Sequence, residues 1–400
     1  MSKEPGLSTN TENKSYQVNT YSRYNVEFVR GDGVYLFDKA GNKYLDLLSG
    51  ISVTGLGHKN KKLINAAVNQ IDNLWHTSNL FTSTPQEQLA KKLCEKSGLS
   101  KVFFCNSGTE ANEAAIKFAR KFGKGKSTII TTDGSFHGRT YGSLSASAQE
   151  KLWEGFQPLT PGFQHTPYNN IESIKNAIDE TTIAIMVEPI QGENGIVIPS
   201  HNYLNEIRNL CDEKNLLMII DEIQTGYGRT GKFFAYQHNN ILPDIVTSAK
   251  GIANGLPLGA VICSEKVAEA ITPGSHGSTF GGNPISIAVA NKVIELITPE
   301  VLEYINSIGL KLAEKIKSEQ IIEIEEIRNK GLMFGLKINS NIDVKLLAKS
   351  FLDEKIVVGT AGNNVLRLLP PYVIDVKNID HFVYILKDLF KKMNISTKAS

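Results

Sequence analysis

The sequence lacks the features that mark several classes of protein. It contains no apolar run of about 18 residues, the length that spans a bilayer as a helix, and polar residues 1–15 include no apolar segment typical of a secretion signal. The histidines include no pair three or four residues apart, so we expect no metal site. Acidic and basic residues nearly balance, with a formal net charge of +2, which argues against a nucleic-acid or membrane surface.

Cysteine is also scarce, and its spacing excludes the common paired motifs. The four cysteines, Cys94, Cys105, Cys211 and Cys263, form no CxxC pair and lie in apolar contexts. We therefore expect reduced, buried thiols rather than a disulfide framework. Together with the missing secretion signal, this predicts a soluble cytoplasmic protein.

The length and the apolar patterning predict an α/β protein with two domains. At 400 residues the chain exceeds the roughly 250–300 residues at which a single core stops growing. From about His58, buried strands alternate with amphipathic helices, a pattern typical of a parallel sheet. We expect helices at 109–122 and 283–316. The strands expected are 101–106, 127–132, 182–188, 216–221, 244–248 and 259–263.

The same pattern suggests how the domains are divided along the chain. Residues 1–20 are rich in Ser, Thr, Asn and Lys and are expected to form a flexible arm. Residues 21–57, which begin with an antiparallel meander, are assigned to a small domain. Residues 58–297 form the large domain, and residues 298–400 return to the small one.

Two residues of opposite charge are predicted to meet at one edge of the sheet. The apolar run at 216–220 delivers Asp221 to the C-terminal end of a strand, and the strand at 244–248 leads to Lys250. Open α/β sheets bind their ligands at this edge. The two residues could form a plain ion pair. Alternatively, the carboxylate holds a cationic ring nitrogen while the amine bonds covalently to a carbonyl cofactor, as pyridoxal phosphate requires.

Three glycine-rich segments compete as phosphate sites. Residues 125–127 (GKS) lack the first glycine of a P-loop, because Arg120 stands there. GYGRTG at 226–231 matches a dinucleotide-binding pattern, but the five residues 221–225 separate it from the preceding apolar run at 216–220, which favours a flexible loop. SGTEANEAA at 107–115 follows a strand and opens a helix, where Thr109 can cap the helix while free N–H groups face an anion. An ordinary cap without a ligand remains the alternative.

Six segments in order resemble one enzyme family. SGTEANE, FHGRTYG, VEPIQGENG, DEIQTGYGRTG, SAKGIANGLPLGA and GSTFGGNP are similar to motifs of the class III aminotransferases, the ornithine and acetylornithine type, and the likeness extends from Tyr21 onward. The resemblance implies the fold-type I architecture of pyridoxal-phosphate enzymes. Its large domain has a mostly parallel seven-stranded sheet, and its smaller α+β domain is built from both termini. It also implies a homodimer with active sites shared between subunits.

The resemblance assigns cofactor roles residue by residue. Lys250 is similar to the residue bonded to pyridoxal phosphate, and Asp221 to the residue that keeps the pyridine nitrogen protonated. Gln224 resembles the contact to the ring oxygen, while Ile223 and Phe136 resemble the contacts to the two ring faces. His137 is expected to be a packed, hydrogen-bonded histidine. The remaining cofactor residues implied are Ser107, Gly108, Thr109, Glu222 and, from the partner subunit, Thr279.

Four further residues are expected to contact the substrate. Arg139 resembles a bidentate clamp for a substrate carboxylate, although a surface ion pair would also explain an arginine here. Arg367 lies in an apolar context, and Glu193 resembles the acid that pairs with it. We hypothesise that Glu193 covers Arg367 in the first half-reaction and releases it for glutamate or 2-oxoglutarate in the second. Ser278 resembles a residue that the partner subunit contributes.

One position narrows the expected substrate. Ornithine aminotransferases carry a tyrosine where this chain has Ile51, and the lost hydroxyl favours a donor whose α-amine is acylated. We therefore expect transfer of the δ-amino group of N2-acetylornithine to 2-oxoglutarate, a step of arginine synthesis. Alternative donors within the family are ornithine, 4-aminobutyrate, succinylornithine and succinyldiaminopimelate. Alternatives from other classes are an NAD(P)-dependent oxidoreductase built on GYGRTG and a non-catalytic binding protein.

Overall fold

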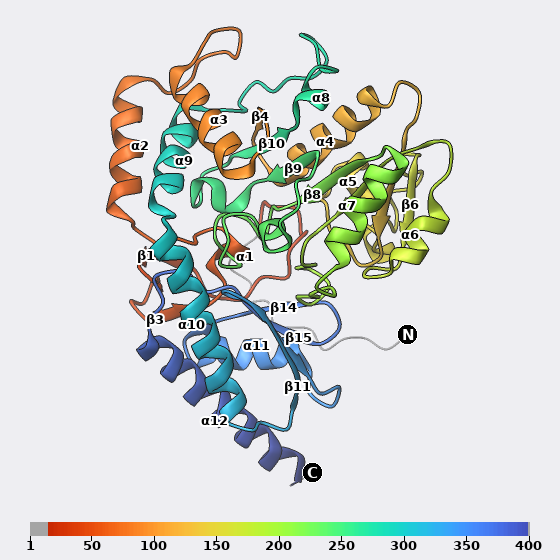
Figure 1. The fold of residues 1–400 in the computed structure, drawn as a ribbon. Coiled ribbons are helices and arrows are strands. Elements are labelled where there is room, and N and C mark those ends of the chain that lie inside the picture. The colour runs from red at the N-terminus through yellow and green to blue at the C-terminus, as the bar shows by residue number, and fades with distance from the viewer. Residues whose placement is uncertain (1–14, 399–400) are drawn as a thin grey trace.

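A computed structural model describes residues 15–398 of the chain, with side chains to residue 392. Most of the predicted arm therefore lies outside the described residues, and residues 15–20 are exposed and belong to no helix or strand. Figure 1 shows a large sheet with its helices in the upper part and a second group of strands, flanked by the long helices α10 and α12, in the lower part. No helix among the described residues combines the length and apolarity that crossing a bilayer requires.

The upper sheet has seven strands in the order β4-β10-β9-β8-β7-β5-β6. β10 runs antiparallel to both neighbours, and the other pairs are parallel. Six strands lie within one residue of the predicted bounds. The seventh, β6, was missed because its sequence, FQHT, has no apolar run. The bounds are β4 Lys101–Cys105, β5 Thr128–Thr132, β6 Phe163–Thr166, β7 Thr182–Val187, β8 Leu217–Asp221, β9 Ile245–Ser248 and β10 Gly259–Cys263.

Helices surround this sheet, and α4 shows why they form where they do. Its small buried residues, Ala111, Ala114, Ala115 and Ala119, allow it to pack closely against the strands. The helices here are α2 Lys61–Asn73, α3 Thr84–Ser97, α4 Gly108–Phe122, α5 Tyr141–Ala146, α6 Ile171–Ala177, α7 Tyr203–Lys214, α8 Glu265–Ala268 and α9 Pro284–Leu296. The short 3-10 helices are η1 Glu150–Leu152, η2 Ala235–Asn239 and η3 Lys250–Ala253.

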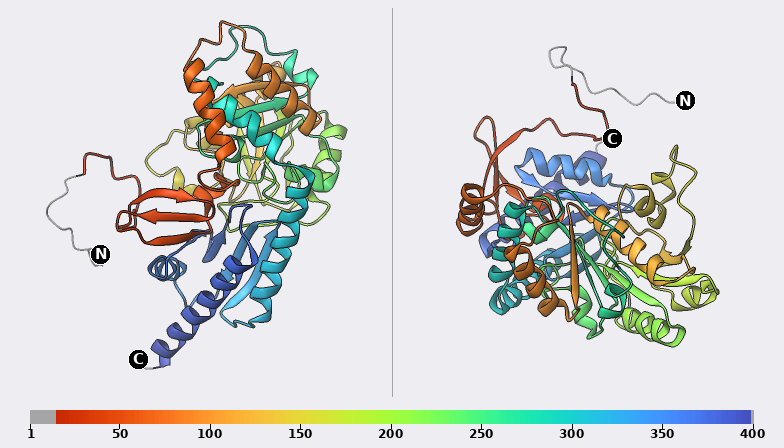
Figure 2. Two further views of the ribbon diagram at one scale, coloured as in Figure 1. Left: turned by 90° about the vertical axis from the view of Figure 1, so that its left-hand side faces the viewer. Right: turned by 90° about the horizontal axis from the view of Figure 1, so that it is seen from above.

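The lower part brings the two ends of the chain together. One sheet pairs the N-terminal meander with β13, which runs parallel to β3. Figure 2 shows these N-terminal strands, in red, beside the blue C-terminal elements. The first sheet has β1 Phe28–Asp32, β2 Tyr35–Asp38, β3 Lys43–Asp46 and β13 Ile356–Val357; the second has β11 Ile324–Lys330, β12 Met333–Ile338, β15 Val365–Leu368 and β14 Gly359–Ala361. The helices are α1 Ser49–Ser52, α10 Pro299–Ser318, α11 Val344–Asp353 and α12 Val376–Lys398. The domain bounds remain a prediction.

The helix predicted at 283–316 is in fact two helices. α9 ends at Leu296 and α10 begins at Pro299. Proline has no backbone N–H and disfavours a helical conformation in the residue before it. Thr298 is accordingly extended, with ψ of 166°. The single-helix prediction was wrong because it followed the apolar periodicity through this proline.

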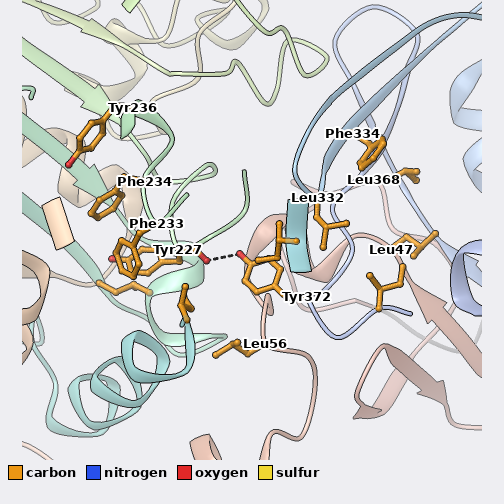
Figure 3. Packing of buried hydrophobic residues seen from close by; sticks show 14 of the residues in the cluster. Leu47, Leu56, Tyr227, Phe233, Phe234, Tyr236, Leu332, Phe334, Leu368 and Tyr372 are labelled. Atoms are coloured by element: carbon orange, nitrogen blue, oxygen red, sulfur yellow. Dashed lines mark hydrogen bonds between the residues drawn. The ribbon is translucent and has the colours of Figure 1, made fainter. Parts of the chain in front are cut away.

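The GYGRTG segment is buried, so the prediction of a flexible loop there was wrong. Residues 226–231 are all buried, and Arg229 is among the largest fully buried side chains. Figure 3 shows Phe233 and Phe234 grouped with Tyr227, and Tyr372 across from Tyr227; the Tyr372 hydroxyl donates to the Tyr227 carbonyl at 2.9 Å. This cluster joins the large sheet to the lower part of the molecule.

The cysteines match the prediction of unpaired thiols. All four are free, three are buried, and Cys94 is partly buried. Burial raises the pKa of Cys105 to about 12, which keeps this thiol protonated and unreactive.

Candidate active site

A cavity of about 410 Å³ lies at the ends of several central strands. Asp221 ends β8, and Lys250 follows β9 after Ala249, so both reach the cavity as the strand order predicts. The structure also places eight other predicted site residues in its wall. They are Ser107, Gly108, Thr109, Phe136, Arg139, Glu193, Ile223 and Gln224.

Three donors fix the Asp221 carboxylate. Oδ2 accepts hydrogen bonds from Asn112 Nδ2 and from His137 Nδ1, both at 2.8 Å, and Oδ1 accepts the Ile223 N–H at 3.0 Å. Asn112 also donates to the His137 carbonyl at 2.7 Å. His137 is therefore buried and hydrogen-bonded, as predicted. Sequence reasoning missed Asn112, although a polar residue within the alanine-rich buried face of α4 was a usable signal.

Lys250 has an unusual backbone conformation and a perturbed amine. It starts η3 with φ of 44°, a region that non-glycine residues rarely adopt. Burial lowers the pKa of the amine below its ordinary value, although Glu193 opposes this shift. Within the described part of the chain, no hydrogen bond or ion pair holds the amine.

The first turn of α4 forms one wall of the cavity. Ser107 is the N-cap, and its side chain accepts from the Glu110 N–H at 3.3 Å. The prediction that Thr109 caps the helix was wrong; its hydroxyl instead pairs with Thr140 Oγ1 at 2.8 Å. A side chain at Gly108 would come within 2.8 Å of Ile223 Cδ1, so this close packing requires glycine. The first N–H groups of a helix have no acceptor within it, and Gly108 and Thr109 of this turn line the cavity.

An aromatic ring and a buried acid lie on another part of the wall. The exposed Arg139 guanidinium lies 5.7 Å from the centre of the Phe136 ring. The Phe136 N–H donates to Glu188 Oε2 at 3.1 Å. Burial, assisted by the nearby Asp221 carboxylate, raises the pKa of Glu188 well above its ordinary value. Sequence reasoning missed Glu188, since the VEPIQGENG segment was used only for Glu193.

Glu193 and Arg367 form the predicted ion pair. Arg367 Nη1 lies 2.5 Å from Glu193 Oε1, and Gln224 Nε2 donates to the same oxygen at 3.1 Å. Burial would raise the pKa of Glu193, but the charge and hydrogen bond of Arg367 outweigh it and lower the pKa. Arg367 does not line the cavity itself, whereas its partner Glu193 does.

Four other residues named from the sequence do not line this chain's own cavity. The Glu222 carboxylate accepts from Thr225 Oγ1 at 2.5 Å and the Tyr236 N–H at 2.9 Å, so it points away from the cavity. Ser278 Oγ accepts from Asn106 at 3.1 Å, outside the lining, and Thr279 is exposed on the same loop. Ile51 packs beside an apolar cluster, while Val53 lines the cavity.

Comparison with known proteins agrees with this geometry. The family model described as "Aminotransferase class-III" matches residues 16–390. The chain belongs to the class III aminotransferases. Members of this family depend on pyridoxal phosphate and catalyse amino-group transfer.

Curated relatives align with nearly the whole length of this aminotransferase. It is 44% identical over 380 residues to the acetylornithine aminotransferase of Aquifex aeolicus, covering 94% of this chain and 100% of that one. It is 45% identical over 378 residues to that of Methanopyrus kandleri, covering 94% and 97%.

Solved structures of enzymes with two different activities share this fold. The ornithine aminotransferase of Toxoplasma gondii superposes with a TM-score of 0.92 at 31% identity, covering 95% of this chain and 94% of that one. The N-acetylornithine aminotransferase of Stenotrophomonas maltophilia gives 0.82 at 32% identity, covering 94% and 98%. The fold therefore does not distinguish between the two substrates.

Proposed function

We propose that the cavity binds pyridoxal phosphate and that Lys250 carries it. The supporting observation is the combination of a buried, fixed carboxylate at Asp221 with a partner-free amine of lowered pKa at Lys250, in one cavity. The rest of the wall also fits this group. Backbone donors of α4 suit a phosphate, Phe136 and Ile223 suit the faces of a ring, and the buried Gln224 Oε1 lacks a hydrogen-bond partner among the described residues.

The network around Asp221 orients the carboxylate for a ring nitrogen. Asn112 and His137 both hold Oδ2, which fixes the direction in which the carboxylate faces the cavity. When bound, pyridoxal phosphate supplies an aldehyde that takes the amino group and a ring that accepts the electron pair released at the substrate carbon. A fixed negative charge at Asp221 favours the protonated ring, which is the better electron acceptor.

Lys250 serves as the group that moves a proton. Its lowered pKa increases the fraction of free amine near neutral pH, as a general base requires. Once the substrate's amino group has replaced that of Lys250 on the cofactor, the released amine, which no other side chain holds, would take a proton from the substrate carbon and return it to the cofactor.

We propose N2-acetylornithine as the amino donor and 2-oxoglutarate as the acceptor, in the cytoplasm. The full-length curated relatives support this donor, and the unpaired cysteines suit a reducing compartment. A second cavity of about 520 Å³ shares Phe136, Arg139 and Glu193 with the first. A carboxylate held by Arg139 would therefore leave room beside it for an acyl group.

The Glu193–Arg367 pair would separate the two half-reactions. The donor reacts at a carbon without a carboxylate, so Arg367 can stay paired. Glutamate carries a carboxylate at its reacting carbon and needs a free cation. We infer that Glu193 moves off Arg367 when glutamate or 2-oxoglutarate binds, and that Gln224 holds it at rest.

We also propose that the enzyme is a homodimer in which Thr279 and Ser278 face the partner's site. Large apolar side chains are exposed around this loop, including Trp75 at 65%, Leu80 at 89% and Phe280 at 63%. A patch of this kind is typical of a protein interface. Cross-linking or sedimentation in solution tests the dimer.

One experiment tests cofactor and donor together. The protein is loaded with pyridoxal phosphate, reduced with borohydride and digested, and the modified peptide is identified by mass. We expect the modification on Lys250. Steady-state kinetics with N2-acetylornithine, ornithine, 4-aminobutyrate and the two succinylated donors should then rank N2-acetylornithine among the best. A modification elsewhere would refute the site, and a poor rank would refute the donor.

A further inference from the structure

The buried Arg229 of GYGRTG has no part in the proposed chemistry, yet it is fully buried. Among the described residues, no acidic side chain forms an ion pair with it. Its Nε donates to Ser52 Oγ at 2.9 Å, and Nη1 donates to the carbonyls of Leu332 at 2.9 Å and Pro370 at 2.6 Å. The guanidinium also lies 4.8 Å from the centre of the Tyr372 ring. Neutral acceptors and an aromatic face thus surround this charge.

These acceptors come from segments far apart in the sequence. Ser52 belongs to the N-terminal turn α1, Leu332 lies between β11 and β12, and Pro370 follows β15, three residues after Arg367. Figure 3 shows Leu332 and Tyr372 at the junction between the large sheet and the lower part of the molecule, across from Tyr227 of the GYGRTG segment. One guanidinium therefore ties the strand that carries Arg367 to the turn that precedes the cavity wall.

The turn that it holds is strained. Ser49, Gly50, Ile51 and Ser52 have φ of 51°, 61°, 66° and 66°. Four successive left-handed residues, one of them β-branched, persist only where the surroundings impose them. The next residue, Val53, lines the cavity.

A hydroxyl relay connects this turn to the backbone of Gln224. Ser52 Oγ accepts from Arg229 and donates to the Gln224 carbonyl at 2.9 Å. The Gln224 side chain holds Glu193, the residue that covers Arg367. Val53, Gln224 and Arg367 are thus all positioned from one buried centre.

We propose that Arg229 is a positioning residue for the substrate site, acting through Ser52 on the strained turn beside the amino donor and through Pro370 on the strand that carries Arg367. It touches neither substrate nor cofactor. The inference rests on the proposed transaminase activity, but not on which donor is used.

The test compares Ser52→Ala with the wild-type holoenzyme, using the donor that performs best in the panel above. Ser52→Ala removes the relay but leaves the arginine and the fold in place. We expect KM for the donor to rise about tenfold, as loss of one charge-assisted hydrogen bond predicts, while kcat changes less than threefold and cofactor affinity stays the same. The control is Ser97→Ala, a buried serine in α3 whose hydroxyl also donates to a backbone carbonyl. It should change none of these values.

Arg229→Lys and the double variant Arg229→Lys/Ser52→Ala separate positioning from general stability. If the two residues act as one unit, the double variant has the same donor KM as Arg229→Lys alone. The proposal is overturned if Ser52→Ala leaves donor KM unchanged, or if cofactor affinity falls in parallel with the rise in donor KM. Should Arg229→Lys fail to fold, the Ser52→Ala result decides alone. Failure of every donor in the panel with wild-type enzyme would instead refute the proposed function.

Discussion

Replacing Glu193 with alanine is expected to change both stability and the balance of the two half-reactions. The change removes the ion-pair partner of Arg367, whose side chain is only 4% exposed. Arg367 would retain one long hydrogen bond, to the Gly192 carbonyl at 3.4 Å, and its Nε already lacks a partner among the described residues. The variant thus leaves a buried cation nearly uncompensated.

The expected loss of stability follows from the burial of the pair. Breaking a fully buried ion pair costs roughly 3–5 kcal/mol because the remaining charge stays buried. The Glu193 side chain is 29% exposed, so water can reach the site. We therefore expect a loss of about 2–3 kcal/mol in the free energy of unfolding, below the range for a fully buried pair.

Although the change is expected to lower stability, it should raise kcat/KM for glutamate. In wild-type enzyme, the glutamate carboxylate must displace Glu193 from Arg367, whereas in the variant this competition is gone. If about 2 kcal/mol of the pairing energy opposes glutamate binding, its removal shifts the ratio of kcat/KM values toward glutamate by about 30-fold.

Single-turnover absorbance measures each half-reaction separately in the holoenzyme. Urea denaturation gives the stability change, and Glu172→Ala, which breaks an exposed pair with Lys175, serves as the control with little effect on either quantity. A folded Glu193→Ala enzyme with an unchanged ratio of the two half-reactions would refute the gate.

Three further changes test other parts of the site. Asp221→Asn removes the negative charge and turns an amide donor toward the donors of Asn112 and His137. We expect both half-reactions to slow at least about 100-fold while the protein stays folded. A smaller effect in stopped-flow absorbance would exclude the proposed role of Asp221. Gly108→Ala places a methyl group 2.8 Å from Ile223 Cδ1. The resulting overpacking costs about 1–3 kcal/mol and should weaken cofactor affinity in a spectroscopic titration. Unchanged affinity would show that Ile223 does not define the ring face. Glu222→Gln tests a pH effect. Burial raises the pKa of Glu222 to about 7 in the native state, against about 4.3 in the unfolded chain. Between these two pH values the native state binds more protons than the unfolded state. Stability therefore falls as pH rises through this window, by an amount of the order of 3 kcal/mol. The Tm of the glutamine variant should fall less than that of the wild type between pH 5 and pH 8, and parallel curves would contradict the assignment.

The sequence alone was enough to predict elements whose signal lies in a few neighbouring residues. Long apolar runs such as 216–220 located six of the seven strands, because a strand buried on both faces has a continuous apolar sequence. Strand order along an α/β chain was enough to bring Asp221 and Lys250 to one cavity. The motifs that resemble the family pointed to eight further residues that line it. The break before Pro299 was equally local, and a proline rule would have found it.

Tertiary structure decided the features that depend on distant partners. Nothing next to Arg229 in the sequence indicates that its donors reach Ser52, Leu332 and Pro370, and an arginine in a glycine-rich segment is typical of an exposed loop. The roles of Asn112 and Glu188 likewise depend on Asp221 and Phe136, which lie on other elements. Periodicity records only which face of an element is buried, whereas the pairing of buried polar groups depends on which elements meet. The sequence alone therefore determined the family and the outline of the site, and only the folded chain decided how the site is held.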